Sequence, residues 1–203
     1  MPGAHLANGR TVSFATVHEP AATERGRAPG LISAPRPAAS VPAMDPREFR
    51  DTMGAFATGV TVVTAQGSDG PAGLTTNAFS SLSLDPALLL VCFDNASRTL
   101  PVVREARRFA VNVLRAGQED LAAVFASKAV QEEKFAAATH RAAHGVPVLD
   151  DALAWFVCDL RELIPGGDHT IGIGAVCDMG AEEGEPLLFW RGGYRALADA
   201  PAR

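Results

Sequence analysis

The amino-acid sequence predicts a mainly β protein, an antiparallel β-barrel with a few flanking helices. Six or more segments rich in β-branched and apolar residues are separated by short turns, and few helical segments lie between them. The competing prediction, a doubly wound α/β sheet, requires a helix after nearly every strand. The C-terminal third of the sequence offers no such helix, and no GxGxxG motif or P-loop follows a strand. Dinucleotide binding by the common fingerprint is therefore unsupported.

Length and composition bound the kind of protein. The chain has 203 residues, of which 47% are hydrophobic and 20% charged, which predicts one packed domain with or without a tail. A net charge of −5 argues against general nucleic-acid binding, and no apolar run is long enough to span a membrane. The N-terminus does not resemble a secretory signal. We therefore expect a soluble, cytoplasmic protein with no nucleic-acid or membrane partner.

The three cysteines are widely spaced and odd in number: Cys92, Cys158 and Cys177. This pattern predicts small buried residues in a reducing compartment. A disulfide framework needs paired cysteines, and a zinc site needs closely spaced ligands, so the sequence predicts neither.

The sequence divides into a tail and a body. Ala, Pro and Gly make up nearly half of residues 1–44, and no sustained helix or strand period appears there. Such a segment buries too little apolar surface to offset its ordering entropy, which predicts a disordered Ala/Pro-rich extension. A short strand at 11–17, or an arm that wraps a partner subunit, is the alternative. The folded domain is expected over 45–203.

The body begins with a predicted helix. Asp45 is a suitable N-cap, Pro46 fits the first helical position, and residues 47–57 follow a helical period. Gly59 is expected to end this helix. Its apolar stripe consists of Phe49, Met53 and Phe56.

The remaining elements follow from β-branched runs and turn residues. Strands are predicted at 60–65, 72–74, 88–93, 108–114, 154–163, 170–179 and 186–191. A turn is predicted at 67–70, helices at 98–107 and 121–127, and a further turn at 132–135.

A first polar cluster lies where the second strand ends. Small hydroxyl and amide residues there leave backbone amides accessible to a flat polar ligand. Taken alone, the segment is also compatible with an ordinary β-turn. The polar residues are Thr75, Thr76, Asn77, Ser80 and Ser81.

A second cluster follows the buried strand at 88–93. Ser97 is placed to cap a helix that begins at Arg98, and the free amides of a helix start bind phosphate readily. Arg98 and Thr99 add a charge and a hydroxyl donor. The alternative is an ordinary helix cap with a solvated arginine.

A third cluster lies at 166–174, where His169 stands at the entrance of a strand. Strand alternation puts Asp168 on the opposite face, so a direct Asp–His dyad is not implied. A single histidine without nearby Cys or His gives no metal site. No GxSxG motif indicates an acyl hydrolase.

Considered together, the motifs identify a family. The sequence contains, in this order, GVTVVT at 59–64, GLTTNAFSSLSLDP at 73–86, FAVNVL at 109–114, GDH at 167–169 and LLFWRGGY at 187–194. These segments resemble the flavin reductase family, which has the split-barrel FMN-binding fold, and the resemblance covers about 49–197. The sequence departs from the family pattern at Thr76, Ala78 and Trp190, which leaves the choice of flavin and of pyridine nucleotide open.

The resemblance implies a homodimer that transfers a hydride from NADH or NADPH to FMN or FAD near the subunit interface. Members commonly supply reduced flavin to a flavin-dependent monooxygenase. His169 would be the catalytic residue and would contact the nicotinamide together with Asp168 and Tyr194. The flavin-binding residues carried over from the motifs, together with Arg98 of the second cluster, are Thr58, Val60, Thr61, Thr75, Thr76, Asn77, Ser80, Ser81, Cys92, Asp94, Ser97, Arg98 and Thr99.

Two other functions remain open from the sequence. A carrier or sensor would bind flavin without turnover, but it would have no need of the GDH segment that is present here. A reductase that keeps its flavin as a prosthetic group would reduce another acceptor. The identity of any monooxygenase partner does not follow from the sequence.

Overall fold

The computed structural model of this chain describes residues 44–197. The predicted extension, apart from Met44, and the alternative strand at 11–17 lie outside these residues. The helices are α1 (Pro46–Met53), α2 (Thr99–Ala106), α3 (Glu119–Ala126) and α4 (Gln131–Ala136). Within residues 44–197, no helix is both long and apolar enough to cross a membrane.

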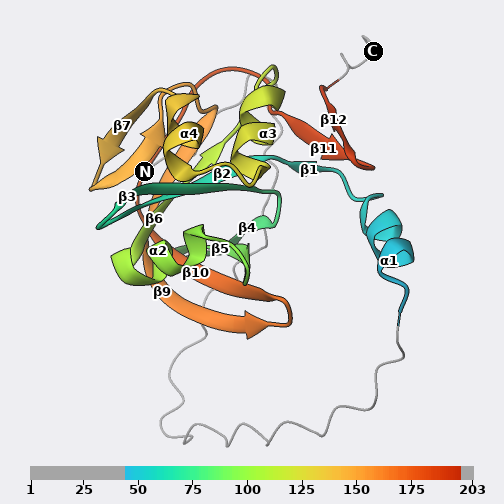
Figure 1. The fold of residues 1–203 in the computed structure, drawn as a ribbon, viewed down its shortest axis with the longest axis horizontal. Coiled ribbons are helices and arrows are strands. Elements are labelled where there is room, and N and C mark those ends of the chain that lie inside the picture. Colours follow the sequence, from blue (N-terminus) through green and yellow to red (C-terminus); the bar gives the residue numbers. More distant parts are fainter. Residues whose placement is uncertain (1–43, 198–203) are drawn as a thin grey trace, which may run out of the picture. The chain divides into compact units, whose positions relative to one another are not determined.

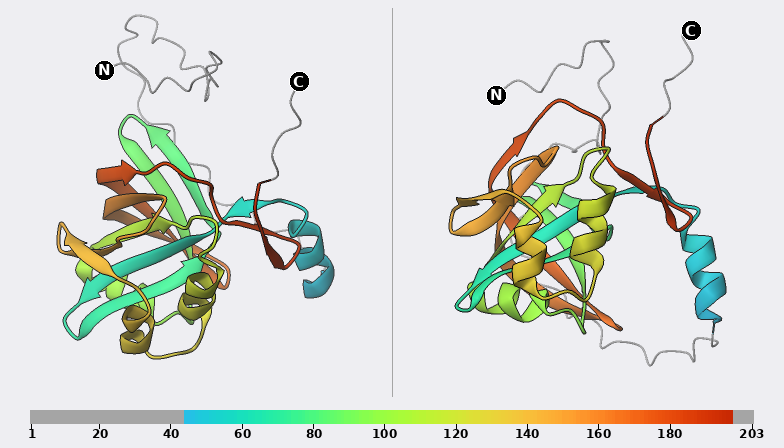
Figure 2. Two further views of the ribbon diagram at one scale, coloured as in Figure 1. Left: turned by 90° about the horizontal axis from the view of Figure 1, so that it is seen from above. Right: turned by 45° about the horizontal axis from the view of Figure 1, so that its top comes forward.

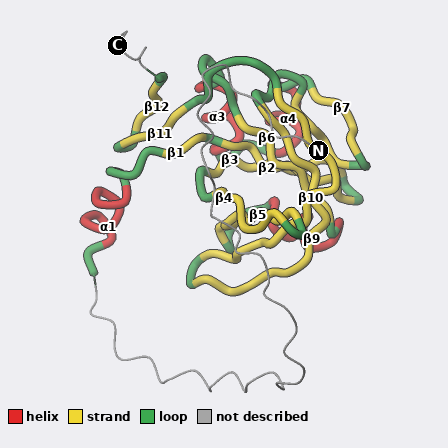
Figure 3. The backbone as a smooth tube through the Cα atoms, turned by 180° about the vertical axis from the view of Figure 1, so that it is seen from behind, coloured by secondary structure: helices red, strands yellow, loops and turns green. Residues whose placement is uncertain are grey.

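A seven-stranded antiparallel sheet dominates the structure (Figures 1 and 3). Its order is β3 (Gly70–Thr76), β2 (Thr61–Gly67), β6 (Arg108–Val113), β9 (Ala154–Gly166), β10 (His169–Ala181), β5 (Ala87–Asp94) and β4 (Phe79–Leu84). A smaller sheet contains β1 (Thr58–Gly59), β11 (Leu188–Trp190) and β12 (Gly193–Arg195), and β7 (His140–Ala143) pairs with β8 (Val146–Leu149). The prediction of a mainly β, split antiparallel barrel is confirmed.

Three helices cover the sheet at its β2–β3 end. The α2 helix packs against β2, and α3 and α4 pack against β3. The α1 helix lies apart, beside the β11–β12 hairpin (Figures 1 and 2). Two hydrogen bonds join α1 and the hairpin: Arg191 N donates to Gly54 O at 3.1 Å, and Trp190 Nε1 donates to Ala55 O at 3.2 Å.

Two pairs of aromatic side chains pack in the hydrophobic core. Phe93 and Phe109 meet edge to face with ring centroids 6.1 Å apart, and Phe125 meets Phe135 in the same way at 5.3 Å. Glycine is required where β10 crosses the first pair. A Cβ at Gly172 would lie 2.7 Å from the ring of Phe93, and one at Gly174 would lie equally close to Phe109, so both positions admit only glycine without repacking.

The first helix is shorter than the sequence predicts. It starts as expected, with Asp45 Oδ1 accepting from Arg47 N at 2.7 Å, but it ends at Met53 rather than near Gly59. Gly54 is the C-cap, and Phe56 lies beyond the helix. The reason is tertiary, because residues 58–59 leave the helical path to pair with β11.

Several short elements were not predicted from the sequence. The first polar cluster runs into β4, and the short strands β7, β8 and β12 were not predicted. The turn expected at 132–135 is the helix α4. Pairing with neighbouring strands stabilises these short strands more than their own residue preferences do.

Candidate functional site

A pocket with a volume of about 580 Å³ opens beside β3. Residues of β3, the loop after β5, the start of α2, the end of α3 and α4 form its wall. Its lining residues are Gly73, Leu74, Thr75, Asp94, Ala96, Ser97, Arg98, Thr99, Phe125, Ala126, Ser127, Lys128, Gln131 and Lys134.

The second polar cluster forms one side of this pocket. Asp94 ends β5, and its Oδ1 accepts from Ala96 N at 2.7 Å, which shapes the loop that follows. Arg98, one residue later than predicted, is the cap residue of α2. The Ser97 hydroxyl still accepts from Thr99 N at 3.1 Å and so satisfies an amide at the helix start.

Arg98 is not a freely solvated side chain. Its Nη2 donates to Lys128 O at 2.8 Å and also to Ala129 O. The guanidinium therefore ties the start of α2 to the loop between α3 and α4. Part of its hydrogen-bonding capacity is used by the fold, while its charge remains at the pocket.

Lys134 places a buried amine in the same pocket. Its side chain is 4% exposed, and Nζ donates to Phe125 O at 2.8 Å and to Gly73 O at 3.5 Å. Burial, and secondarily the nearby charge of Arg98, lowers the pKa of Lys134 from 10.5. Among residues 44–197, no carboxylate forms an ion pair with this amine.

The pocket is positively charged although the chain is acidic. Arg98, Lys128 and Lys134 give three cationic side chains against the carboxylate of Asp94, and Lys128 and Lys134 are the only two lysines in the sequence. Concentration of positive charge in a concave site favours an anionic ligand. A phosphate group fits this donor set, which combines amine, guanidinium and hydroxyl groups.

The first polar cluster is divided between the pocket and its surroundings. Thr75 lines the pocket, and its hydroxyl donates to Ala122 O at 2.7 Å. Asn77 lies in the turn after β3 and donates from Nδ2 to Thr58 Oγ1 at 3.1 Å. Thr76 Oγ1 accepts from Ala78 N at 3.1 Å and shapes that turn. This cluster thus connects β3 to β1.

Several predicted flavin residues do not line the pocket. The side chains of Val60 and Thr61 are buried, and the Thr61 hydroxyl donates to Thr76 O at 2.7 Å. Cys92 is half-buried within β5, and Cys177 is exposed, so the prediction of buried cysteines is correct only for Cys158. Ser80 and Ser81 are exposed on the edge strand β4, and Tyr194 packs edge to face on Phe189 in the β11–β12 hairpin.

The third cluster corrects a prediction about Asp168. His169 Nδ1 and Asp168 Oδ1 lie 2.8 Å apart, so the two residues do form a direct pair. Strand alternation does not apply, because β10 begins at His169 and Asp168 belongs to the preceding turn. Gly167 permits that turn with a φ of +74°. The hydrogen bond from His169 lowers the pKa of the Asp168 carboxyl.

Asn95, which was not predicted, fastens this turn to the loop after β5. Its backbone N donates to Asp168 O at 3.0 Å, and its Nδ2 donates to Gly167 O at 3.2 Å. Its Oδ1 accepts from the Thr170 hydroxyl at 2.7 Å. Since His169 also pairs with Asp94 across β10 and β5, the third cluster lies next to the second.

The arrangement supports binding and orientation more than acid–base catalysis. A cationic pocket holds an anionic group, and a histidine held by a carboxylate stands beside it. In residues 44–197, no three His, Cys, Asp or Glu side chains converge to hold a metal ion. The pocket lysines were missed because the sequence predicted only a turn at 132–135. Their being the only lysines in the chain was the available signal.

Comparisons with known proteins agree with the fold and the motifs. A family model described as "Flavin reductase like domain" matches residues 53–198. A protein of Rhizobium meliloti named "Probable flavin reductase" is 47% identical over 152 residues, which cover 74% of this chain and 48% of that protein. This chain thus spans about half the length of that relative.

Two further proteins are similar over most of their own length. The flavin-dependent monooxygenase reductase subunit HsaB of Mycobacterium tuberculosis is 39% identical over 158 residues, covering 76% of this chain and 83% of that protein. The structure of Streptomyces globisporus C-1027 NADH:FAD oxidoreductase SgcE6, in complex with NAD and FAD fragments, superposes with a TM-score of 0.73 and 36% identity. That match covers 80% of this chain and 100% of the other.

Proposed function

This chain belongs to the flavin reductase family, and we propose that it transfers a hydride from NADH or NADPH to FMN or FAD. The observation that carries this proposal is the joining of two sites. The cationic pocket and the Asp168–His169 turn are connected through the loop after β5. One site suits a phosphate-bearing flavin, and the other suits the nicotinamide of the reductant.

The residues of the pocket fit a flavin nucleotide. A volume of about 580 Å³ lies within the range of small-molecule sites. The amine of Lys134 and the hydroxyls of Ser97 and Thr99 supply donors for a phosphate. Thr75 also lines the pocket and lies two residues before Asn77, so β3 leads from the pocket toward the predicted ring contacts.

The protein's task is to bind and orient two nucleotides. A bound flavin supplies the hydride-accepting ring, which is chemistry of the cofactor. Amide and hydroxyl groups around 75–77 would donate hydrogen bonds to that ring, and His169 would orient the nicotinamide beside it. No side chain is required to transfer a proton, so the half-buried His169 is assigned an orienting role.

We also propose that the protein is a homodimer. Phe49 and Met53 on α1 are 54% and 53% exposed, and Phe56, which follows the helix, is 72% exposed. On edge strand β4, Leu84 is 79% exposed. We expect a second copy of the chain to bury these exposed apolar side chains. A Phe49→Asp/Met53→Asp variant should sediment as a monomer, and an unchanged dimer would place the interface elsewhere.

A flavin-dependent monooxygenase is the proposed recipient of the reduced flavin. HsaB is named as the reductase subunit of such an enzyme, which supports the same role for this chain. We propose that residues 45–203 form the catalytic domain, and the family match at 53–198 supports these bounds. Dependence on NADH or NADPH supports a cytoplasmic location.

Steady-state oxidation of NADH and NADPH, with and without added FMN or FAD, tests the proposal. We expect oxidation that depends on added flavin and saturates with it. A purified protein that stays yellow and needs no added flavin would instead support a prosthetic flavin. Flavin binding without oxidation of either nucleotide would support a carrier.

A further inference from the structure

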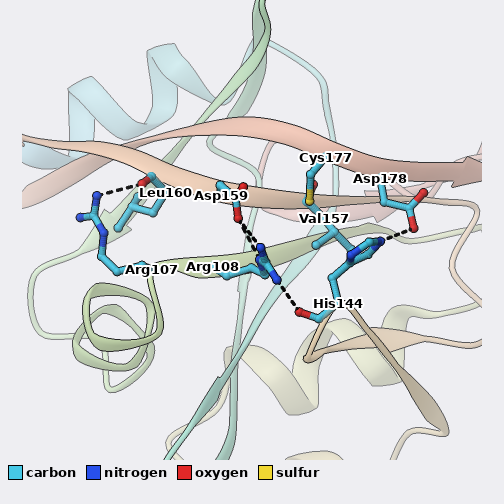
Figure 4. Close-up of polar contacts among 8 residues, drawn as sticks. All are labelled: Arg107, Arg108, His144, Val157, Asp159, Leu160, Cys177 and Asp178. Atoms are coloured by element: carbon cyan, nitrogen blue, oxygen red, sulfur yellow. Dashed lines mark hydrogen bonds and ion pairs between the residues drawn. The ribbon is translucent and has the colours of Figure 1, made fainter.

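Two histidine–aspartate pairs each include one residue of strand β10, and they use different ring nitrogens. His169 is bonded through Nδ1 to Asp168 at 2.8 Å, just before the strand. His144, in the turn between β7 and β8, is bonded through Nε2 to Asp178 at 3.0 Å (Figure 4). Neither pair lines the cationic pocket, but Asn95 joins the turn of the first pair to the loop after β5, whereas Asp178 lies near the far end of β10. The second pair is therefore a natural control for the first.

The bonded nitrogen in each pair must carry the proton. An ionised carboxylate only accepts hydrogen bonds, so the imidazole donates. The pKa of Asp168 is lowered by its hydrogen bond from His169, which keeps the carboxylate ionised near neutral pH. In neutral His169, Nδ1 therefore holds the hydrogen and Nε2 is the acceptor. In neutral His144, the assignment is reversed.

The Asp168 backbone is held firmly although its side chain lies in solvent. Asn95 donates hydrogen bonds to Gly167 and Asp168 and accepts one from Thr170, which fixes the turn, while the Asp168 side chain is 94% exposed. A contact so exposed contributes little to folding stability. A carboxylate on a fixed turn can nevertheless determine the orientation and tautomer of the neighbouring ring.

We propose that Asp168 is a positioning residue that presents Nε2 of His169 as a hydrogen-bond acceptor to the nicotinamide carboxamide. The inference rests on the proposed function, because it requires His169 to meet the pyridine nucleotide. It differs from the prediction that Asp168 itself contacts that nucleotide. Asn95 supports this positioning indirectly, because its hydrogen bonds fix the turn that carries Asp168.

Nitrogen NMR of the imidazole rings in the full chain tests the tautomer without any ligand. At a pH where the rings are neutral, we expect His169 as the Nδ1–H form and His144 as the Nε2–H form. Asp168→Ala should shift His169 away from the Nδ1–H form and leave His144 unchanged. Asp178→Ala should do the reverse. A His169 signal that Asp168→Ala leaves unchanged would overturn the inference.

A double-mutant cycle on NADH kinetics tests the positioning role. Asp168→Ala should lower kcat/KM for NADH by about three- to tenfold, with the melting temperature unchanged. In a His169→Ala background, the same substitution should have no further effect. Asp178→Ala should leave kcat/KM unchanged.

Multiplicative losses in the double variant would show that Asp168 contacts the nucleotide directly, which would contradict a positioning role. A lack of any kinetic effect of Asp168→Ala alone would also contradict the positioning role. An unaltered protein that oxidises no NADH would contradict the proposed function itself. Unchanged imidazole signals in an active protein would contradict only this inference.

Discussion

Replacement of Lys134 by methionine should weaken FMN binding while sparing riboflavin binding. Methionine is similar in length but carries no charge, so the change removes the amine and keeps most of the packing volume. A hydrogen bond to a charged group contributes about 1.5–3 kcal/mol. At about 1.4 kcal/mol per factor of ten, the expected loss of FMN affinity is roughly ten- to hundredfold.

The effect on folding should be smaller, because two contributions oppose each other. Loss of the 2.8 Å contact leaves the Phe125 carbonyl without its donor, which costs about 1–3 kcal/mol. Removal of a buried ammonium, whose pKa is already lowered by burial, relieves its desolvation. We therefore expect the free energy of unfolding to fall by no more than about 2 kcal/mol.

Fluorescence titration of FMN and riboflavin into both proteins measures the difference. Riboflavin lacks the phosphate and is the ligand control, and Lys134→Arg is the variant control that keeps the charge. In the unaltered protein, FMN affinity should also fall as pH rises through the lowered pKa of Lys134 toward 10.5, because the charged amine is lost. The methionine variant should lack that pH dependence. Equal losses of FMN and riboflavin affinity, or no loss of either, would refute the placement of the phosphate.

Three further predictions follow from the site and the chain. Ser97→Ala should weaken FMN binding more than riboflavin binding, because the Ser97 hydroxyl lies at the start of α2, where we place the FMN phosphate. Isothermal titration calorimetry with both ligands checks this. His169→Ala should lower kcat/KM for NADH by roughly ten- to hundredfold with little change in flavin affinity, whereas a lower melting temperature with unchanged kinetics would indicate a structural role. Deletion of residues 1–43 should leave dimerisation and reductase activity within a few-fold, because α1 has its own cap at Asp45; a monomeric or inactive truncation would make that segment a structural arm.

The fold class and the main strands were predictable because β-branched and apolar runs mark them directly. The buried strand β5 and the long strands β9 and β10 lie within a few residues of their predicted bounds. Strand β4 was missed because Ser80, Ser81 and Ser83 are typical of turns, and its formation depends on pairing with β5. Strands β7 and β8 were missed because their turn places His144 and Gly145 at positive φ, a use of histidine that sequence patterns seldom reveal.

The site was predictable where a motif carried it and not where tertiary contacts made it. Ser97, Asp94 and His169 lie close together as the ordered motifs implied. The burial of Lys134 depends on how α4 meets the end of α3 and strand β3, which no local pattern encodes. The Asp168–His169 contact was not predicted, because alternation treated Asp168 as a strand residue, although β10 begins at His169.

Anaerobic reduction of free flavin by NADH is the most direct test of the central claim. The protein is mixed in catalytic amount with excess FMN and NADH, and the loss of the yellow flavin absorbance is followed without oxygen. We predict that each protein molecule reduces many flavin molecules. The rate should be proportional to protein concentration and lower with the His169→Ala variant. Bleaching limited to one flavin per subunit, or none above the uncatalysed rate, would contradict it.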